Sequence, residues 1–225
     1  IGITGDYLER AEGLVSSGVA FLCVDVAHGH HILMKEALGT LREKYPDLHL
    51  MAGNVATLEA VNALSDWGAD SVRCNIGGGS ICSTRIQTGH GVPGLHTVLE
   101  CAKTDRNVKI IADGGIRNSG DIVKALAAGA DAVMCGSLFA GCTEAPGEVF
   151  RSSSGETWKT YRGMASKEAQ TDWKGKYSSL EGVASKVPYR GSVSVVLNDL
   201  RRGIRSGFSY TGARNIEELQ AKAQF

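Results

Sequence analysis

The sequence predicts an α/β fold, and a TIM (β/α)8 barrel is the architecture that fits it best. Apolar runs typical of strands alternate with segments of helical periodicity, and five such pairs follow one another along the chain. Each apolar run is nearly continuous, as expected for strands that are buried on both faces of a parallel sheet. A doubly wound sheet would show the same alternation.

Two features favour the barrel. Polar residues of functional character fall directly after strands, and the last two strands end in phosphate-loop sequences, DGG at 113–115 and GS at 136–137. In TIM barrels the loops after the seventh and eighth strands commonly bind a phosphate. If these two are strands seven and eight, the chain lacks the first strands of the barrel. Its start at Ile1 instead of Met agrees with a processed or truncated piece.

The element boundaries follow from periodicity, caps and breakers. Leu8, Ala11 and Val15 recur at helical spacing in the first helix. Pro46 ends the second helix, and Thr57 caps the third. The strands with their following loops are expected over 19–29, 48–55, 68–79, 108–115 and 130–137, and the helices over 5–18, 30–45, 57–67, 92–104 and 119–129.

The alternation stops after Ser137. The next fifty or so residues are polar and glycine-rich with weak periodicity, and long loops of this kind are usually lids or binding flaps. We therefore expect a flap or loop insertion at about 140–191, followed by two closing helices over 192–212 and 215–225. Residues 1–225 are expected to form a single catalytic barrel domain that is partial at its N-terminus.

Composition excludes several classes of protein. With 225 residues, 43% of them hydrophobic, the chain can bury a large core, and the balance of 24 basic against 24 acidic residues does not indicate a nucleic-acid or membrane partner. The six cysteines lack CxxC pairs, which indicates reduced thiols in a cytoplasmic protein. His28, His30 and His31 have no carboxylate or cysteine partners at ligand spacing, so a solvated loop is favoured over a zinc site.

The stretch NIGGGSICSTR, from Asn75 to Arg85, is the strongest candidate site. Three consecutive glycines leave backbone amides open to an anion, and a cysteine and a threonine follow within a few residues. An anion cradle and a candidate nucleophile therefore share one loop.

Several ordered segments carry a family resemblance: GGGSICSTR, IIADGGIRNSGDIVKALAAGAD, VMCGSLFAG, TYRGMAS, and LEG before VPYRG. Together they resemble the family of inosine monophosphate dehydrogenases and guanosine monophosphate (GMP) reductases, over nearly the whole chain. The resemblance implies an oxidoreductase of purine metabolism that binds a purine nucleotide, GMP or inosine monophosphate (IMP), and assembles as a homotetramer.

By this resemblance Cys82 is the nucleophile that attacks C2 of the purine, since a cysteine combines nucleophilicity with leaving ability. Read without the resemblance, Cys82 could be a small buried hydrophobe. Thr84 matches the threonine that helps to move protons at the leaving group, with a helix cap as the alternative. Glu181 would partner Thr84 in the release of ammonia.

The resemblance also places the nucleotide. Its phosphate would lie among the amides and hydroxyls of Ser80, Gly115, Gly136, Ser137 and Tyr161. Asp113 matches the aspartate that binds the ribose, although AspGlyGly could also be only a tight turn. Met164 and Ala165 match the segment that contacts the base.

The second ligand implied by the resemblance is a nicotinamide cofactor. Asp25, Asn54 and Arg73 match positions that line its side of the pocket. The preferred form is NADPH in the reductases and NAD in the dehydrogenases. The dehydrogenase branch also holds a monovalent cation, K⁺, which would here bind near Gly77, Gly79 and Cys82.

The branch depends on the flap. The dehydrogenases carry an ArgTyr pair on a long flap, whereas only TDWKGKYSSL separates Gln170 from Glu181 here. This predicts a GMP reductase, which reduces GMP with NADPH to IMP and ammonia through a covalent Cys82 intermediate. Three other segments, RGM, TEAPGE and VDVAHGH, lean toward bacterial IMP dehydrogenases, which oxidise IMP with NAD. An inactive purine-nucleotide-binding barrel is the third reading.

Overall fold

The structure is a computed structural model that describes residues 1–177 and 180–225, in which the chain forms two compact units. The first unit comprises Ile1–Ile76, Val92–Ala112 and Ala128–Ala132, and the second comprises Gly77–Gly91, Asp113–Ala127 and Val133–Phe225. Ser178 and Ser179, which belong to the short segment predicted as a flap, lie outside the described residues. That the chain acts as a single catalytic domain stays a prediction. No helix of the described residues is both long and apolar enough to cross a membrane.

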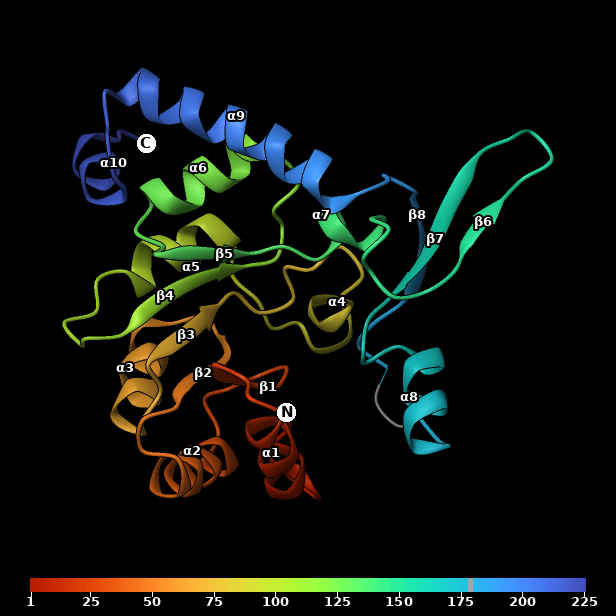
Figure 1. Ribbon diagram of the computed structural model, residues 1–225. Helices are drawn as coiled ribbons and strands as arrows, with labels where there is room; N and C mark the ends of the chain where they lie inside the picture. Colours follow the sequence, from red (N-terminus) through yellow and green to blue (C-terminus); the bar gives the residue numbers. More distant parts are fainter. Residues whose placement is uncertain (178–179) are drawn as a thin grey trace. The chain divides into compact units, whose positions relative to one another are not determined.

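Most of a parallel sheet lies in the first unit (Figure 1). Parallel register joins the first strand to the second, the second to the third and the third to the fourth. A doubly wound sheet reverses its strand order at a switch point, whereas this sheet keeps the order of the chain, as a barrel does. The strands, in sheet order, are β1 (Phe21–Asp25), β2 (His49–Val55), β3 (Ser71–Cys74), β4 (Lys109–Asp113) and β5 (Ala132–Met134).

The helices of the first unit begin and end where the sequence predicted. The Thr57 hydroxyl accepts from the Ala60 amide at 3.2 Å and so caps the third helix. The second helix ends at Lys44, and its C-cap residue Tyr45 directly precedes Pro46. These helices are α1 (Tyr7–Ser16), α2 (Ile32–Lys44), α3 (Leu58–Asp66) and α5 (Gly94–Cys101).

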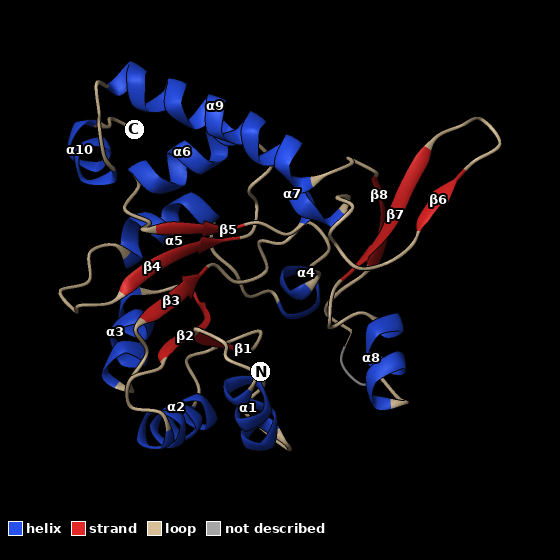
Figure 2. Ribbon diagram, in the orientation of Figure 1, coloured by secondary structure: helices blue, strands red, loops and turns tan. Residues whose placement is uncertain are grey.

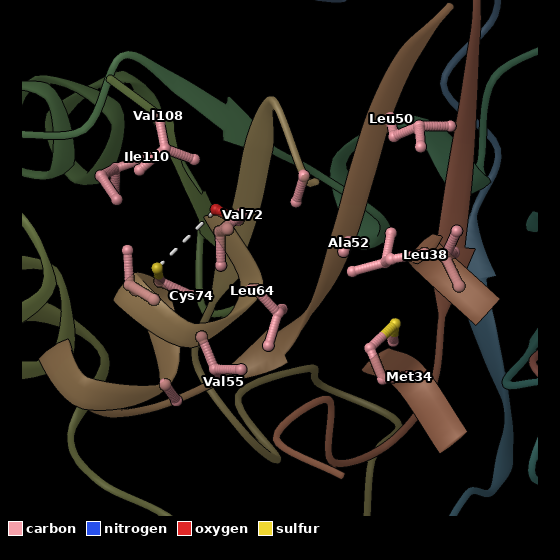
Figure 3. Packing of buried hydrophobic residues seen from close by; sticks show 14 of the residues in the cluster. Met34, Leu38, Leu50, Ala52, Val55, Leu64, Val72, Cys74, Val108 and Ile110 are labelled. Atoms are coloured by element: carbon pink, nitrogen blue, oxygen red, sulfur yellow. Dashed lines mark hydrogen bonds between the residues drawn. The ribbon is translucent and has the colours of Figure 1, made fainter. Parts of the chain in front are cut away.

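The hydrophobic core of the first unit lies between these strands and helices (Figure 3). Met34 and Leu38 of α2 belong to the same cluster as Leu50 of β2, and Leu64 of α3 lies near Val72 of β3, all of them fully buried. Burial of each such side chain stabilises the fold by about 1.5–3 kcal/mol. This core is therefore the main source of stability of the unit.

Burial on both faces, which we predicted for every strand, holds for β3 but not for the two edge strands. All four residues of β3 are buried. By contrast Phe21 of β1 is half exposed, and none of the three residues of β5 is buried. Edge strands have a neighbour on one side only, so fewer elements cover them, and an apolar sequence alone does not reveal this.

Helices α6 (Ser119–Ala127), α9 (Val193–Thr211) and α10 (Ile216–Lys222) pack together in the second unit (Figure 1). Two glycines of α9 allow close approach to α6. A Cβ atom on Gly207 would lie 2.7 Å from a methyl group of Val123, and Gly203 faces the Ser119 side chain. The two closing helices are thus confirmed. The remaining helices are α4 (Thr84–Thr88), α7 (Ser137–Ala140) and α8 (Lys167–Lys174).

The segment expected as an irregular flap contains regular structure. Strands β6 (Val149–Arg151), β7 (Thr157–Arg162) and β8 (Ala184–Pro188) form an antiparallel sheet in that order (Figure 2). The sequence pattern did not reveal these strands because β6 and most of β8 are exposed and leave no hydrophobic period, while the role of the segment as a flap stays a prediction. The signal that could have found β7 is its run of β-branched and aromatic residues, TWKTY.

Candidate active site

The glycine-rich loop lies against the loop that follows β4, within the second unit. Gly114 has a φ of +80°, which favours glycine, and a Cβ atom on it would lie 2.8 Å from the carbonyl carbon of Gly78. Gly115, with a φ of +74°, lies next to the same carbonyl. The glycines therefore let two backbones approach closely, and this brings the glycine-rich loop next to Gly115. That Ser80 and Gly115 bind the phosphate stays a prediction.

Cys82 is the first member of a hydrogen-bonded line of three side chains. Its Sγ atom lies 3.2 Å from the Thr84 hydroxyl, and that hydroxyl donates to the Glu181 carboxylate at 2.7 Å. Cys82 is partly exposed, while Thr84 is buried. The line therefore runs from a thiol that a ligand can reach to a carboxylate behind it.

Backbone pairing fixes this line, although Thr84 and Glu181 lie 97 residues apart. Cys82 forms an isolated antiparallel bridge with Gly182. The Ser83 amide donates to the Glu181 carbonyl and the Val183 amide to the Ile81 carbonyl, each at 2.9 Å. The cysteine loop and the segment at 181–183 thus form one short ladder, which sets the position of the carboxylate.

Thr84 is not a helix cap. Ser83 occupies the N-cap position of α4, and Thr84 is the first residue of the helix. Its side-chain oxygen donates to Glu181 instead of accepting from the helix amides. The structure thus places the hydroxyl where a proton relay needs it. This fits the role that the resemblance implied, while the role itself stays a prediction.

The predicted phosphate ligands Gly136 and Tyr161 lie in contact. The Tyr161 hydroxyl fills the space that a side chain on Gly136 would need. Burial, and to a smaller degree the negative charge of Asp113, raises the pKa of Tyr161 above its ordinary value. The same two causes raise the pKa of Cys135. Tyr161 is therefore a neutral hydroxyl donor at physiological pH, close to Asp113 and beside the α7 turn that begins with Ser137.

The segment predicted to contact the base adjoins the Cys82 loop. A Cβ atom on Gly182 would lie 3.2 Å from the Ala165 carbonyl carbon, and one on Gly163 would lie 3.5 Å from the Ile81 side chain. Met164, which lies between these contacts in the chain, is 65% exposed. An exposed apolar residue in a segment that adjoins the Cys82 loop suits contact with a planar ligand.

The structure also shows residues that sequence reasoning gave no role. Ser166 is fully buried and caps α8, and the buried Gln170 donates from its side chain to the Ala165 carbonyl at 3.1 Å. Both hold the 163–165 segment in place. A serine directly before a helical segment is a common N-cap, so Ser166 could have been predicted from the sequence. No local sequence signal indicates the hydrogen bond from the Gln170 side chain to the Ala165 carbonyl.

The three residues predicted on the cofactor side lie in the first unit. Arg73 forms an ion pair with Asp25, with 2.8 Å between Nη1 and Oδ1, and also donates to Cys23. The Asn54 side chain donates to the Asn75 carbonyl at 2.8 Å. Asp25 is largely exposed whereas Arg73 is buried. The Asn54 amide and the Asp25 carboxylate fit the carboxamide and hydroxyl groups of a nicotinamide nucleoside. The cofactor role of all three residues stays a prediction.

Two candidate ion sites differ in their geometry. The Gly79 carbonyl accepts from the Cys82 amide at 3.1 Å. A monovalent cation near Gly77, Gly79 and Cys82 stays a prediction. In the histidine loop, the His31 side chain accepts from the Leu33 amide and caps α2, and the His30 ring lies 5.7 Å from the Trp67 ring. Among the described residues, no group of three His, Cys, Asp or Glu side chains could hold a metal.

Comparison with known proteins identifies the family to which this chain belongs. The whole chain, residues 1–225, matches the model of the IMP dehydrogenase / GMP reductase domain. The chain belongs to the IMP dehydrogenase/GMP reductase family. The family predicted from the sequence is therefore confirmed, and so is the α/β barrel fold class.

Members of both branches of the IMP dehydrogenase/GMP reductase family are similar to this chain. Inosine-5'-monophosphate dehydrogenases from Nitrosopumilus maritimus and Aquifex aeolicus are 44% and 47% identical to it; each match covers 100% of the chain and 50% and 48% of the relative. A variant of GMP reductase from Trypanosoma brucei, solved in complex with guanosine 5'-monophosphate, is 42% identical with a TM-score of 0.95, over 100% of this chain and 48% of that one. The chain spans about half the length of the curated relatives it matches.

Proposed function

We propose that this protein is an NADPH-dependent GMP reductase, which converts GMP to IMP and ammonia through a covalent bond to Cys82. The line from Cys82 through Thr84 to Glu181 carries this proposal, because it joins a nucleophile to a carboxylate that can hold a proton. Family membership supports oxidoreductase chemistry, and the Trypanosoma brucei relative was solved with guanosine 5'-monophosphate.

The same line of side chains balances the protons of the first half-reaction. Cys82 gives its proton toward Thr84 and Glu181 and attacks C2 of the purine, so that a C–S bond forms. The amino group on C2 then takes a proton from the same pair and leaves as ammonia. Because the proton that the thiol loses is the one that the leaving group needs, the buried Thr84 hydroxyl can serve both transfers.

The second half-reaction reduces C2 and frees the enzyme. NADPH, when bound, would supply the hydride that reduces C2. The C–S bond then breaks, the electron pair returns to sulfur and IMP leaves, and the Cys82 thiolate takes up one proton from solvent to restore the thiol. In this scheme Glu181 ends with the charge that it had at the start, and the short ladder between Cys82 and Gly182 keeps the reacting sulfur in one place.

An NAD-dependent IMP dehydrogenase is the second candidate, favoured by the names of the dehydrogenase relatives from Nitrosopumilus maritimus and Aquifex aeolicus. That reaction runs through the same cysteine adduct but ends with water in place of ammonia. The short segment between Gln170 and Glu181, which has no ArgTyr pair, favours the reductase.

The test follows the absorbance of reduced nicotinamide in both directions with purified protein. We expect loss of NADPH absorbance and release of ammonia with GMP, and no gain of absorbance with IMP and NAD. Gain only in the second mixture would identify a dehydrogenase and overturn the reductase proposal. Nucleotide binding with no turnover in either mixture would indicate the inactive barrel.

A further inference from the structure

Lys159 of β7 is among the largest fully buried side chains of the molecule and has no place in the reaction described above. It is 1% exposed. Its ammonium group donates to the Cys142 carbonyl at 3.0 Å and also to the Ala145 carbonyl. In the described part of the chain it forms no ion pair. A buried ammonium group costs free energy unless it is fully hydrogen-bonded, so its position calls for an explanation.

The carbonyls that hold Lys159 belong to the turn that follows α7. The Cys142 amide donates to the Phe139 carbonyl, so this turn continues directly from the helix. Glu144 of the same turn accepts from the Val193 amide and the Ser192 hydroxyl at the start of α9, each at 2.8 Å. The hydrogen bonds to Glu144, led by that of the Val193 amide, lower its pKa, and the Lys159 charge adds a smaller effect.

Both ends of the α7 segment are held by one strand. Lys159 and Tyr161 are two residues apart on β7, so their side chains leave the same face of the strand. Lys159 holds the carbonyls after α7, while the Tyr161 hydroxyl lies against Gly136, the residue that precedes it. A shift at the Lys159 end would therefore move Gly136 and Ser137 relative to Tyr161.

We propose that Lys159 is a positioning residue for the 5'-phosphate of the nucleotide, because it fixes the α7 segment against β7 and so sets the distance between the Gly136–Ser137 amides and the Tyr161 hydroxyl. The inference rests on the proposed function, in which these groups bind the phosphate. Lys159 does not touch the ligand. Its effect is on affinity for the phosphate group, not on the chemistry at Cys82.

The test compares ligands with and without the phosphate. In Lys159→Met, which keeps the length of the side chain and removes its donors, we expect KM for GMP to rise up to about 100-fold, since small displacements of binding groups have effects of this size. We expect kcat to change much less, and binding of guanosine, which has no phosphate, to stay unchanged. Lys159→Gln keeps two N–H donors and should rescue part of the loss.

Lys186→Met is the matched control. Lys186 lies on the neighbouring strand β8, is exposed and covers the Trp158 ring, with 4.5 Å from Nζ to the ring centroid. Its contact with Trp158 involves neither α7 nor the turn after it. KM for GMP should therefore stay at the wild-type value.

A double-mutant cycle with Tyr161→Phe separates positioning from general stabilisation. If Lys159 acts through Tyr161 and Gly136, the double variant should bind GMP no more weakly than the weaker single variant. Additive losses, equal losses of GMP and guanosine binding, or unfolding of both Lys159 variants would each overturn the inference. Should wild-type protein bind GMP no better than guanosine, the proposed function would fail before Lys159 is tested.

Discussion

Two sets of buried residues, one from each compact unit of this protein, differ in what they contact. In the first unit, apolar side chains such as Leu50, Leu64 and Val72 pack between parallel strands and helices. In the second unit, Thr84 and Lys159 are buried polar groups whose partners lie far along the chain. An apolar core tolerates any partner of suitable volume, whereas a buried polar group requires one specific partner.

This contrast predicts separate consequences of mutation. Changes to the apolar core of the first unit should lower stability and leave the chemistry of the folded molecules intact. Changes to the polar line of the second unit should lower turnover with little effect on stability. The four substitutions below test this separation, from the largest expected effect to the smallest.

Replacing the nucleophile should have the largest effect. In Cys82→Ser we expect turnover to fall by at least about 10³-fold, because a serine hydroxyl is a far weaker nucleophile. Nucleotide affinity should stay within about threefold, since the phosphate groups are untouched. Steady-state rates and equilibrium binding measure the two quantities. An equal loss of binding and turnover would mean that Cys82 is structural.

A cavity in the first unit should cost stability instead. Leu64→Ala removes a fully buried side chain of α3, and we expect the free energy of unfolding to fall by about 2–5 kcal/mol. Leu197→Ala on α9, where leucine is 49% exposed, is the matched control and should cost at most about 0.5 kcal/mol. Denaturant unfolding measures both. A loss of kcat in folded Leu64→Ala protein would break the separation between the units.

Neutralising the carboxylate of the relay should slow one step. In Glu181→Gln the hydrogen bond from Thr84 can persist, but the group can no longer take up a proton, so we expect ammonia release to slow by about 100-fold. Glu168→Gln, an exposed acid on α8, should change nothing. Single-turnover ammonia release is the readout. Unchanged turnover would remove Glu181 from the mechanism.

The smallest effect is expected on stability, from removing the charge of Asp70 in the first unit. Burial raises the pKa of Asp70, but the Leu50 amide and Arg42 outweigh it, so the net pKa lies below its ordinary value. A depressed carboxyl pKa gives stability that is present above the ordinary pKa, near 4, and is lost as pH falls through the folded-state pKa. Asp70→Asn should therefore be less stable than wild type at neutral pH.

The gap between Asp70→Asn and wild type should close as the pH falls below about 4, where the wild-type carboxylate also becomes neutral. Urea unfolding over a pH series measures this. Asp199→Asn, which removes an exposed pair with Arg202, should show almost no gap at any pH. A gap for Asp70→Asn that persists in acid would show that its amide fits the site poorly for reasons other than charge.

Much of the first unit could be predicted, because its signals are local. The spacing of Leu8, Ala11 and Val15, the Thr57 cap and the Pro46 breaker each act within a few residues, and the helices begin and end accordingly. The antiparallel sheet of the second unit could not be predicted so well. Strand β6 and most of β8 are exposed, so the pattern of burial that marks a strand is absent from these two strands.

The sequence by itself determined the alternation of strands and helices, the glycine loop with Cys82, and the family to which the chain belongs. Only the tertiary structure decided that Thr84 donates to Glu181 and that Lys159 holds the turn after α7. The physical reason is the range of the interactions. Propensities and caps act between neighbours in the chain, whereas a buried hydroxyl or ammonium group takes the partner that folding brings to it.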